Sequence, residues 1–99
     1  MASQRKVGGM NEPRKADDEV QGYADQVKSK VEEAVGRKLD RYEAKLYTTQ
    51  LVNGINYFVK IDTGDGKFVH VRLHKTFQGD ITFHSCQDSK SENDALEYF

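Results

Sequence analysis

The sequence predicts an α+β fold in which one helix lies across one face of an antiparallel sheet of at least four strands. Three observations carry this prediction. Apolar residues recur every three or four positions over residues 18–35, which is typical of an amphipathic helix. From Leu39 onward the spacing changes to every second residue, which is typical of strands with one buried face. Short turns separate these strands, and short links join antiparallel neighbours.

The predicted helix has a recognisable start and end. Asp17 or Asp18 can accept hydrogen bonds from the first free amides of the helix. Gly36 follows the last turn and can adopt the left-handed backbone that often ends a helix. Because valine lowers helix propensity, we expect the helix to depend on packing its apolar stripe against the sheet. The stripe consists of Val20, Tyr23, Ala24, Val27, Val31, Ala34 and Val35.

Each predicted strand carries apolar residues on one parity. The first strand is the exception, with Tyr42, Leu46 and Thr48 on one parity and Tyr47 and Thr49 on the other. The later sets are, in chain order, Ile55, Tyr57, Val59 and Ile61; Val69, Val71 and Leu73; and Ile81 with Phe83. Turn residues stand between the strands at positions 53–54, 64–66 and 79–80. The Asn-Gly and Asp-Gly pairs found there favour tight hairpins, because such turns need positive φ.

The composition indicates one small folded domain over residues 1–99, in which residues 1–16 lack sustained periodicity and are expected to form a flexible N-terminal arm. A net charge of −1 lacks the basic excess of a nucleic-acid-binding domain. No apolar run approaches the roughly 18 residues of a membrane span. Cys86 is the single cysteine, and the first residues lack an apolar signal region, so we expect a cytoplasmic protein without disulfides.

The histidines and Cys86 could form a catalytic or metal site only if they converged. With a turn at residues 76–80, a simple register pairs His70 with Cys86 and Arg72 with His84 on the outward, solvated face of the sheet. A nucleophile on such an open face has no cleft and no oxyanion hole. His70 and His74 are roughly 13 Å apart along one strand, too far to share a zinc ion. The sequence therefore predicts neither catalysis nor a metal or other cofactor.

A strand that binds RNA is a weak alternative. Residues 67–71, Lys-Phe-Val-His-Val, are faintly similar to the strand that stacks bases in RNA-recognition domains. The glycine and the second aromatic residue of that signature are missing. The acidic balance of the chain also argues against it.

Two predicted hairpin tips carry apolar side chains where polar ones are usual. Leu51 and Val52 precede the first turn, and Phe77 precedes Gln78 in the second. Exposed apolar side chains at tips indicate a contact surface. The alternative is that these side chains fold back into the ends of the core.

These residues, taken in order, resemble the stefins, the disulfide-free branch of the cystatin family. Residues 50–54, Gln-Leu-Val-Asn-Gly, fit the family's Q-x-V-x-G hairpin, and residues 8–9 are similar to its N-terminal glycine pair. Residues 55–60, residues 68–71 and the ending 94–99, Asp-Ala-Leu-Glu-Tyr-Phe, are also stefin-like. The resemblance covers essentially the whole chain.

The resemblance implies a helix on a five-stranded antiparallel sheet and tight, reversible inhibition of papain-like cysteine proteases such as cathepsins, without enzymatic activity. In that family the N-terminal arm and two hairpin tips form one wedge that enters the active-site cleft. The residues implied here are Val7, Gly8, Gly9, Met10, Gln50, Leu51, Val52, Asn53, Gly54, Phe77 and Gln78. The resemblance further implies a monomer that can form a domain-swapped dimer.

This chain also departs from the family pattern. Phe77-Gln78 stands where many stefins have Leu-Pro, so the stiffness of proline is lost in the second tip. Asn53 replaces the commoner alanine in the first tip. These changes bear on which proteases are bound best. The alternative function is a cystatin-fold interaction module without protease inhibition.

Overall fold

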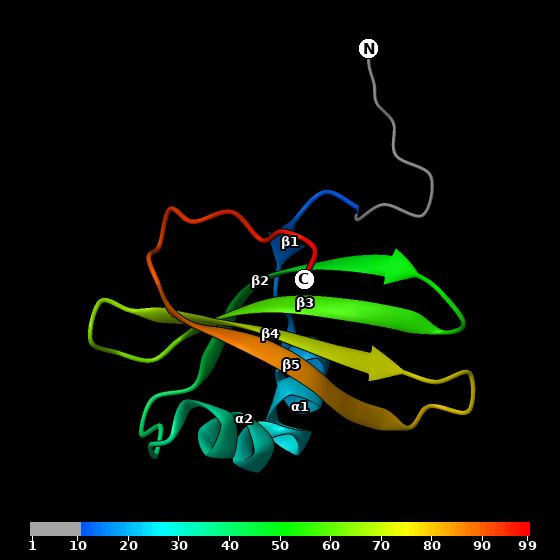
Figure 1. The fold of residues 1–99 in the computed structure, drawn as a ribbon. Coiled ribbons are helices and arrows are strands. Elements are labelled where there is room, and N and C mark those ends of the chain that lie inside the picture. The colour runs from blue at the N-terminus through cyan, green and yellow to red at the C-terminus, as the bar shows by residue number, and fades with distance from the viewer. Residues whose placement is uncertain (1–10) are drawn as a thin grey trace.

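A computed structural model describes residues 11–99 as one five-stranded antiparallel sheet with helices across one face (Figure 1). The strands lie in chain order, β1-β2-β3-β4-β5. The elements are β1 (Arg14–Lys15), α1 (Asp18–Gln26), α2 (Lys28–Val35), β2 (Glu43–Leu51), β3 (Ile55–Asp62), β4 (Phe68–Lys75) and β5 (Ile81–Lys90). The α+β fold class is thereby confirmed. Within residues 11–99, no helix is long and apolar enough to cross a membrane.

The predicted single helix is divided at Val27. Asp17 caps the start by accepting a 2.9 Å hydrogen bond from the amide of Val20, and Gly36 ends the second segment with φ 78°. At the break, the Val27 amide donates to the carbonyl of Ala24 at 3.1 Å. This carbonyl is three residues earlier in the sequence, whereas a regular α-helix bonds to the carbonyl four residues earlier. Since α1 packs on β2 and α2 on β5, the break redirects the helix across the twisted sheet.

Part of the expected arm is a strand. Arg14 and Lys15 form β1 against Tyr47 and Leu46 of β2, and the Ala16 amide donates to the carbonyl of Lys45 at 3.0 Å. The sequence could not show this strand, because two residues carry no periodicity. Residues 14–16 are therefore tied to the edge of the sheet instead of being free.

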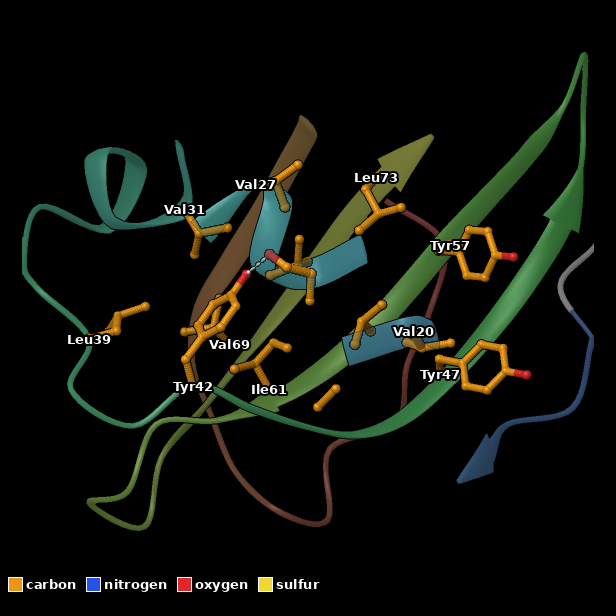
Figure 2. Close-up of a cluster of buried hydrophobic side chains, with 14 residues drawn as sticks. Val20, Val27, Val31, Leu39, Tyr42, Tyr47, Tyr57, Ile61, Val69 and Leu73 are labelled. Carbon is orange, nitrogen blue, oxygen red and sulfur yellow. Dashed lines mark hydrogen bonds between the residues drawn. The ribbon is translucent and has the colours of Figure 1, made fainter. Parts of the chain in front are cut away.

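The main core lies between the helices and the inner face of the sheet (Figure 2). It contains the valine stripe of the helix, with Val31 fully buried, and the predicted inward residues of β3 and β4. Tyr42 reaches across from the segment before β2, and its hydroxyl donates to the carbonyl of Ala24 at 2.9 Å. Burial raises the pKa of this phenol, so it remains a neutral donor.

Over β3 and the start of β4, the outer face of the sheet is covered and not solvated, contrary to the prediction. The segment that follows β5 folds back over it, and Phe58 and His70 beneath have no exposed surface. The rings of Tyr98 and Phe99 lie 6.0 and 5.6 Å from that of Phe58, and Leu96 is buried. The prediction of a solvated face was wrong because alternation along a strand shows which face is buried in the core but not what covers the other face.

The predicted pairing of β4 with β5 is also wrong. His70 lies opposite Gln87 and Val71 opposite Cys86, because the register shifts at a β-bulge where His84 is the extra residue. A shift of one residue moves a side chain to the other face of the sheet. Cys86 consequently packs against the main core and is not on the outer face with His70.

Candidate functional site

Two hairpins with apolar tips project from the same end of the sheet. The β2–β3 and β4–β5 turns lie side by side there, and the β3–β4 turn lies at the opposite end (Figure 1). The side chains of Leu51 and Phe77 are 75% and 79% exposed, and that of Val52 is 42% exposed. The alternative that these side chains fold back into the core is therefore wrong. We call residues 50–54 the first tip and residues 76–80 the second tip.

The first tip is a tight turn that rests on the end of β4. The Val52 amide donates to the carbonyl of Gly54 at 3.1 Å, and Asn53 and Gly54 adopt φ values of 49° and 112°. A Cβ atom at Gly54 would lie 2.4 Å from the carbonyl oxygen of Lys75 and 2.9 Å from Nε2 of His74. Glycine is therefore required here by both the backbone angle and the close approach.

A series of hydrogen-bonded side chains on the outer face of the sheet holds the first tip in place. The Asn56 side-chain amide donates to Oε1 of Gln50 at 3.0 Å, and Asn56 Oδ1 lies 2.7 Å from Nδ1 of His74. The other ring nitrogen of His74, Nε2, lies 3.0 Å from the carbonyl oxygen of Asn53. Asn56 and Gln50 are both buried. This series of hydrogen bonds thus joins the start of the first tip to its apex through β3 and β4.

The second tip is closed by Thr76. Its amide donates to the carbonyl of Asp80 at 2.9 Å, its carbonyl accepts from the Gly79 amide at 2.9 Å, and its hydroxyl accepts from the Asp80 amide at 3.0 Å. Gly79 supplies the positive φ of 98° that the turn needs. Phe77 and Gln78 remain outside this loop of hydrogen bonds and are exposed.

The N-terminal segment enters the sheet beside the first tip. The Asn11 amide donates to the carbonyl of Thr49 at 2.8 Å, and its side-chain amide donates to the Thr49 hydroxyl at 2.8 Å. The hydroxyl of Thr48 donates to the carbonyl of Asn11. The predicted contact residues Val7, Gly8, Gly9 and Met10 lie outside the described residues, but their attachment point is next to Gln50.

Aromatic side chains support both tips from the inner face. The rings of Tyr47 and Tyr23 lie 6.0 and 5.2 Å from that of Tyr57. Lys75, at the end of β4, donates to the Tyr23 hydroxyl at 2.9 Å, and this hydrogen bond raises the pKa of the lysine. Helix α1 is thereby linked to the base of the second tip.

The described residues contain no group of three or more His, Cys, Asp or Glu side chains that could hold a metal ion. Cys86 is half-buried, and burial raises the pKa of its thiol, which disfavours the reactive thiolate. Phe68, the aromatic residue of the RNA-binding alternative, is buried and offers no stacking surface. The projecting end of the sheet therefore presents apolar side chains on a rigid base and suits contact with another molecule.

Sequence reasoning missed three residues of this end: Asn11, Asn56 and His74. Asn56 and His74 stand on the outward parity of adjacent strands, close to the first turn. That shared parity is a signal that could have paired them. For Asn11, which precedes β1 and bonds directly to Thr48 and Thr49 of β2, the sequence holds no comparable signal.

Comparison with known proteins identifies the class. The model of the cystatin domain matches residues 8–98. Cystatin-B of Oplegnathus fasciatus is 42% identical over 95 residues, which cover 93% of this chain and 95% of that protein. Cystatin-A of Mus musculus is 42% identical over 94 residues, covering 93% and 97%, and Stefin-2 of Mus musculus is 36% identical over 98 residues, covering 96% and 95%.

The fold and the exposed tips thus define a cystatin-type domain, a class of protease inhibitors and not of enzymes. Within that class, the chain belongs to the stefin family of cysteine protease inhibitors.

Proposed function

We propose that this protein is a tight-binding, reversible inhibitor of papain-like cysteine proteases (cathepsins) and that it blocks the active-site cleft with three segments. These are residues 7–10 of the arm, the first tip and the second tip. The single observation that carries the proposal is the exposure of Leu51, Val52 and Phe77 at one end of the sheet. Apolar side chains exposed together cost solubility and favour contact with a partner.

The rigidity of the two tips supports tight binding. Gly54 rests on β4, Thr76 closes the second tip, and neither hairpin needs to be ordered when the complex forms. Association then avoids much of the entropy cost that a flexible loop would add. Two preformed apolar points can bury surface in a cleft at little conformational cost.

The place of Asn11 supports a role for the arm. Its hydrogen bonds to Thr49 fix the chain next to the first tip. Four residues span at most about 14 Å, so residues 7–10 can reach the region in front of the tips. Gly8 and Gly9 lack a Cβ atom, which allows close approach of the backbone to the protease. The chain can then turn away before it presents a peptide bond to the nucleophilic cysteine.

Titration of papain with the purified protein tests the proposal. We expect stoichiometric loss of activity, and recovery of both proteins intact after dissociation. The variant Leu51→Asp places a charge at the first tip and should weaken inhibition roughly thirtyfold or more, as for the loss of a central contact.

The matched control is Ser29→Asp, which adds the same charge on the exposed surface of α2 and should inhibit like the wild type. A folded wild-type protein that leaves papain fully active would contradict the proposal. It would favour the alternative of a cystatin-fold interaction module. Equal inhibition by Leu51→Asp and the wild type would exclude the first tip from the interface.

We also propose that the protein acts in the cytoplasm, mainly as a monomer that can form a domain-swapped dimer, and that it binds neither nucleic acid nor membranes. Its single cysteine and its net charge of −1 support this setting.

A further inference from the structure

His74 holds the first tip in a way that depends on its proton. Its Nε2 faces the main-chain carbonyl of Asn53, which can only accept, so this hydrogen bond forms only when the nitrogen carries a hydrogen. Its Nδ1 faces Oδ1 of Asn56, whose amide group donates in turn to Gln50 Oε1. An imidazole with acceptors at both nitrogens is satisfied when both are protonated, that is, as the imidazolium.

The neutral imidazole requires a different arrangement of the same side chains. When Nδ1 loses its proton, it becomes an acceptor that faces the acceptor Oδ1 of Asn56. Asn56 must then turn its amide to donate to His74, and its oxygen turns toward Gln50. Gln50 must turn as well in order to donate. Asn56 and Gln50 are both buried. The loss of one proton at His74 therefore either removes the hydrogen bond to Asn53, when Nε2 loses it, or requires two buried amides to reorient together, when Nδ1 loses it.

The residues that His74 meets on neighbouring elements do not titrate. They are Asn56 of β3, Thr82 of β5 and Asn53 of the first tip. The charged neighbours on its own strand are Arg72, which lies against Phe58 and Tyr98, and Lys75, which is bonded to Tyr23. Among residues 11–99, no ion pair with a carboxylate involves His74.

We propose that His74 is the positioning residue of the first tip and that its protonation makes the protein bind a protease more tightly in acid. The inference rests on the proposed function. A charged donor forms roughly twice as strong a hydrogen bond as a neutral one. The bond from His74 to Asn53 is therefore stronger in the imidazolium, and the first tip is held more firmly in the geometry that meets the protease. His74 acts through the tip and is not itself a contact residue.

Nuclear magnetic resonance of the free protein tests the coupling without any protease. We expect the side-chain amide signals of Asn56 and Gln50 and the main-chain amide of Gly54 to titrate with the midpoint of the His74 ring. In His74→Gln these signals should not change between about pH 8 and pH 5. The control His84→Gln removes a histidine whose hydrogen bond is to Ser85, away from the tip, and should titrate like the wild type. Amide signals that do not follow His74 would overturn the coupling.

Dissociation from papain tests the consequence. For each variant we take the ratio of its dissociation rates at about pH 7.5 and pH 5.5, so that the protease's own pH dependence cancels between variants. The ratio should be about threefold larger for the wild type and for His84→Gln than for His74→Gln. Equal ratios would overturn the role of His74 and leave the proposed function intact. A wild type that inhibits at neither pH would overturn the proposed function and this regulation together, whatever the nuclear magnetic resonance result.

Discussion

Asn11 and Thr49 are joined by two hydrogen bonds of 2.8 Å, one between main-chain atoms and one between side chains. This pair attaches the N-terminal segment to β2 two residues before Leu51, where the first tip begins to project. The attachment fixes the start of the arm beside the first tip.

Deletion of residues 1–10 should weaken inhibition of papain by roughly ten- to a thousandfold. Val7 and Met10 are the apolar residues nearest to Asn11, and burial of one such side chain contributes about 1.5–3 kcal/mol before the cost of ordering the arm. The loss should appear mainly as faster dissociation, measured by competition with a substrate. Gly9→Trp should be comparably damaging, because a bulky side chain blocks close approach.

Deletion of residues 1–5 is the control for the arm, since it leaves Val7 to Met10 in place and should change inhibition little. If the protein without residues 1–10 inhibits as well as the intact chain, the arm has no part in binding.

Gly54→Ala should disrupt the first tip. The new Cβ atom would meet the Lys75 carbonyl at 2.4 Å, and φ of 112° is unfavourable for alanine. We expect inhibition to weaken roughly tenfold or more, equivalent to about 1.4 kcal/mol. Gly66→Ala is the matched control: its φ is 76°, but nothing lies within 4 Å of the new atom, and it is in the turn at the opposite end. That variant should lose about 1–2 kcal/mol of stability from backbone strain and no inhibition. Equal inhibition by both variants would contradict the role of the first tip.

Acid should destabilise the protein through His70. Burial, followed by the charges of Lys60 and Lys90, lowers the pKa of His70 to about 4. Within residues 11–99, neither ring nitrogen of His70 has a hydrogen-bond partner, so the folded state favours the neutral ring. In the unfolded chain the same ring takes up its proton near pH 6.5. Between about pH 6.5 and 4 the unfolded state therefore binds more protons, and stability falls as pH falls.

The variant His70→Leu isolates this contribution of His70. As the pH falls through this interval, the free energy of unfolding should decrease less for His70→Leu than for the wild type. The difference between the two decreases should be of the order of 3 kcal/mol. Carboxylates titrate in both proteins and cancel in the difference. Denaturant unfolding at a series of pH values gives the measurement. Parallel pH profiles for the two proteins would show that His70 is not a buried neutral group.

Cys86→Ser should cost stability but not inhibition. The thiol packs against the main core, so a hydroxyl in its place should lower the free energy of unfolding by about 1 kcal/mol. Papain inhibition should stay within about twofold of the wild type, because Cys86 lies in β5 and the change is distant from both tips. In the native protein a thiol reagent should react more slowly than with the unfolded chain, since burial raises the pKa of the thiol. A large loss of inhibition would contradict this assignment.

Mild heating should produce a dimer that no longer inhibits papain. If residues 50–54 open as a hinge, the helices and β2 of one molecule can pack on the sheet of another. Opening also extends the first tip and removes it from the interface. Size-exclusion chromatography followed by papain titration of each peak measures this. A heat-induced dimer with full inhibitory activity would place the hinge elsewhere.

Local patterns in the sequence determined the helix ends and the strands. Asp17 and Gly36 cap the helices as predicted, because caps act through bonds to amides or carbonyls a few residues away. Alternation set the inward faces of β3 and β4, because one-sided burial imposes a period of two. The apolar residues of both tips also stood out, since a turn favours polar ones.

The tertiary structure alone decided the features that depend on distant partners. The break at Val27 follows the twist of the sheet, and β1 exists only because β2 pairs with it. The bulge at His84 moved Cys86 to the core, and the segment after β5 buried His70. His74 reaches Asn53 across 21 residues of sequence. The periodicity of one segment indicates which of its sides is buried. These contacts each need two segments that are distant in the sequence, so the pattern of either segment alone does not predict them.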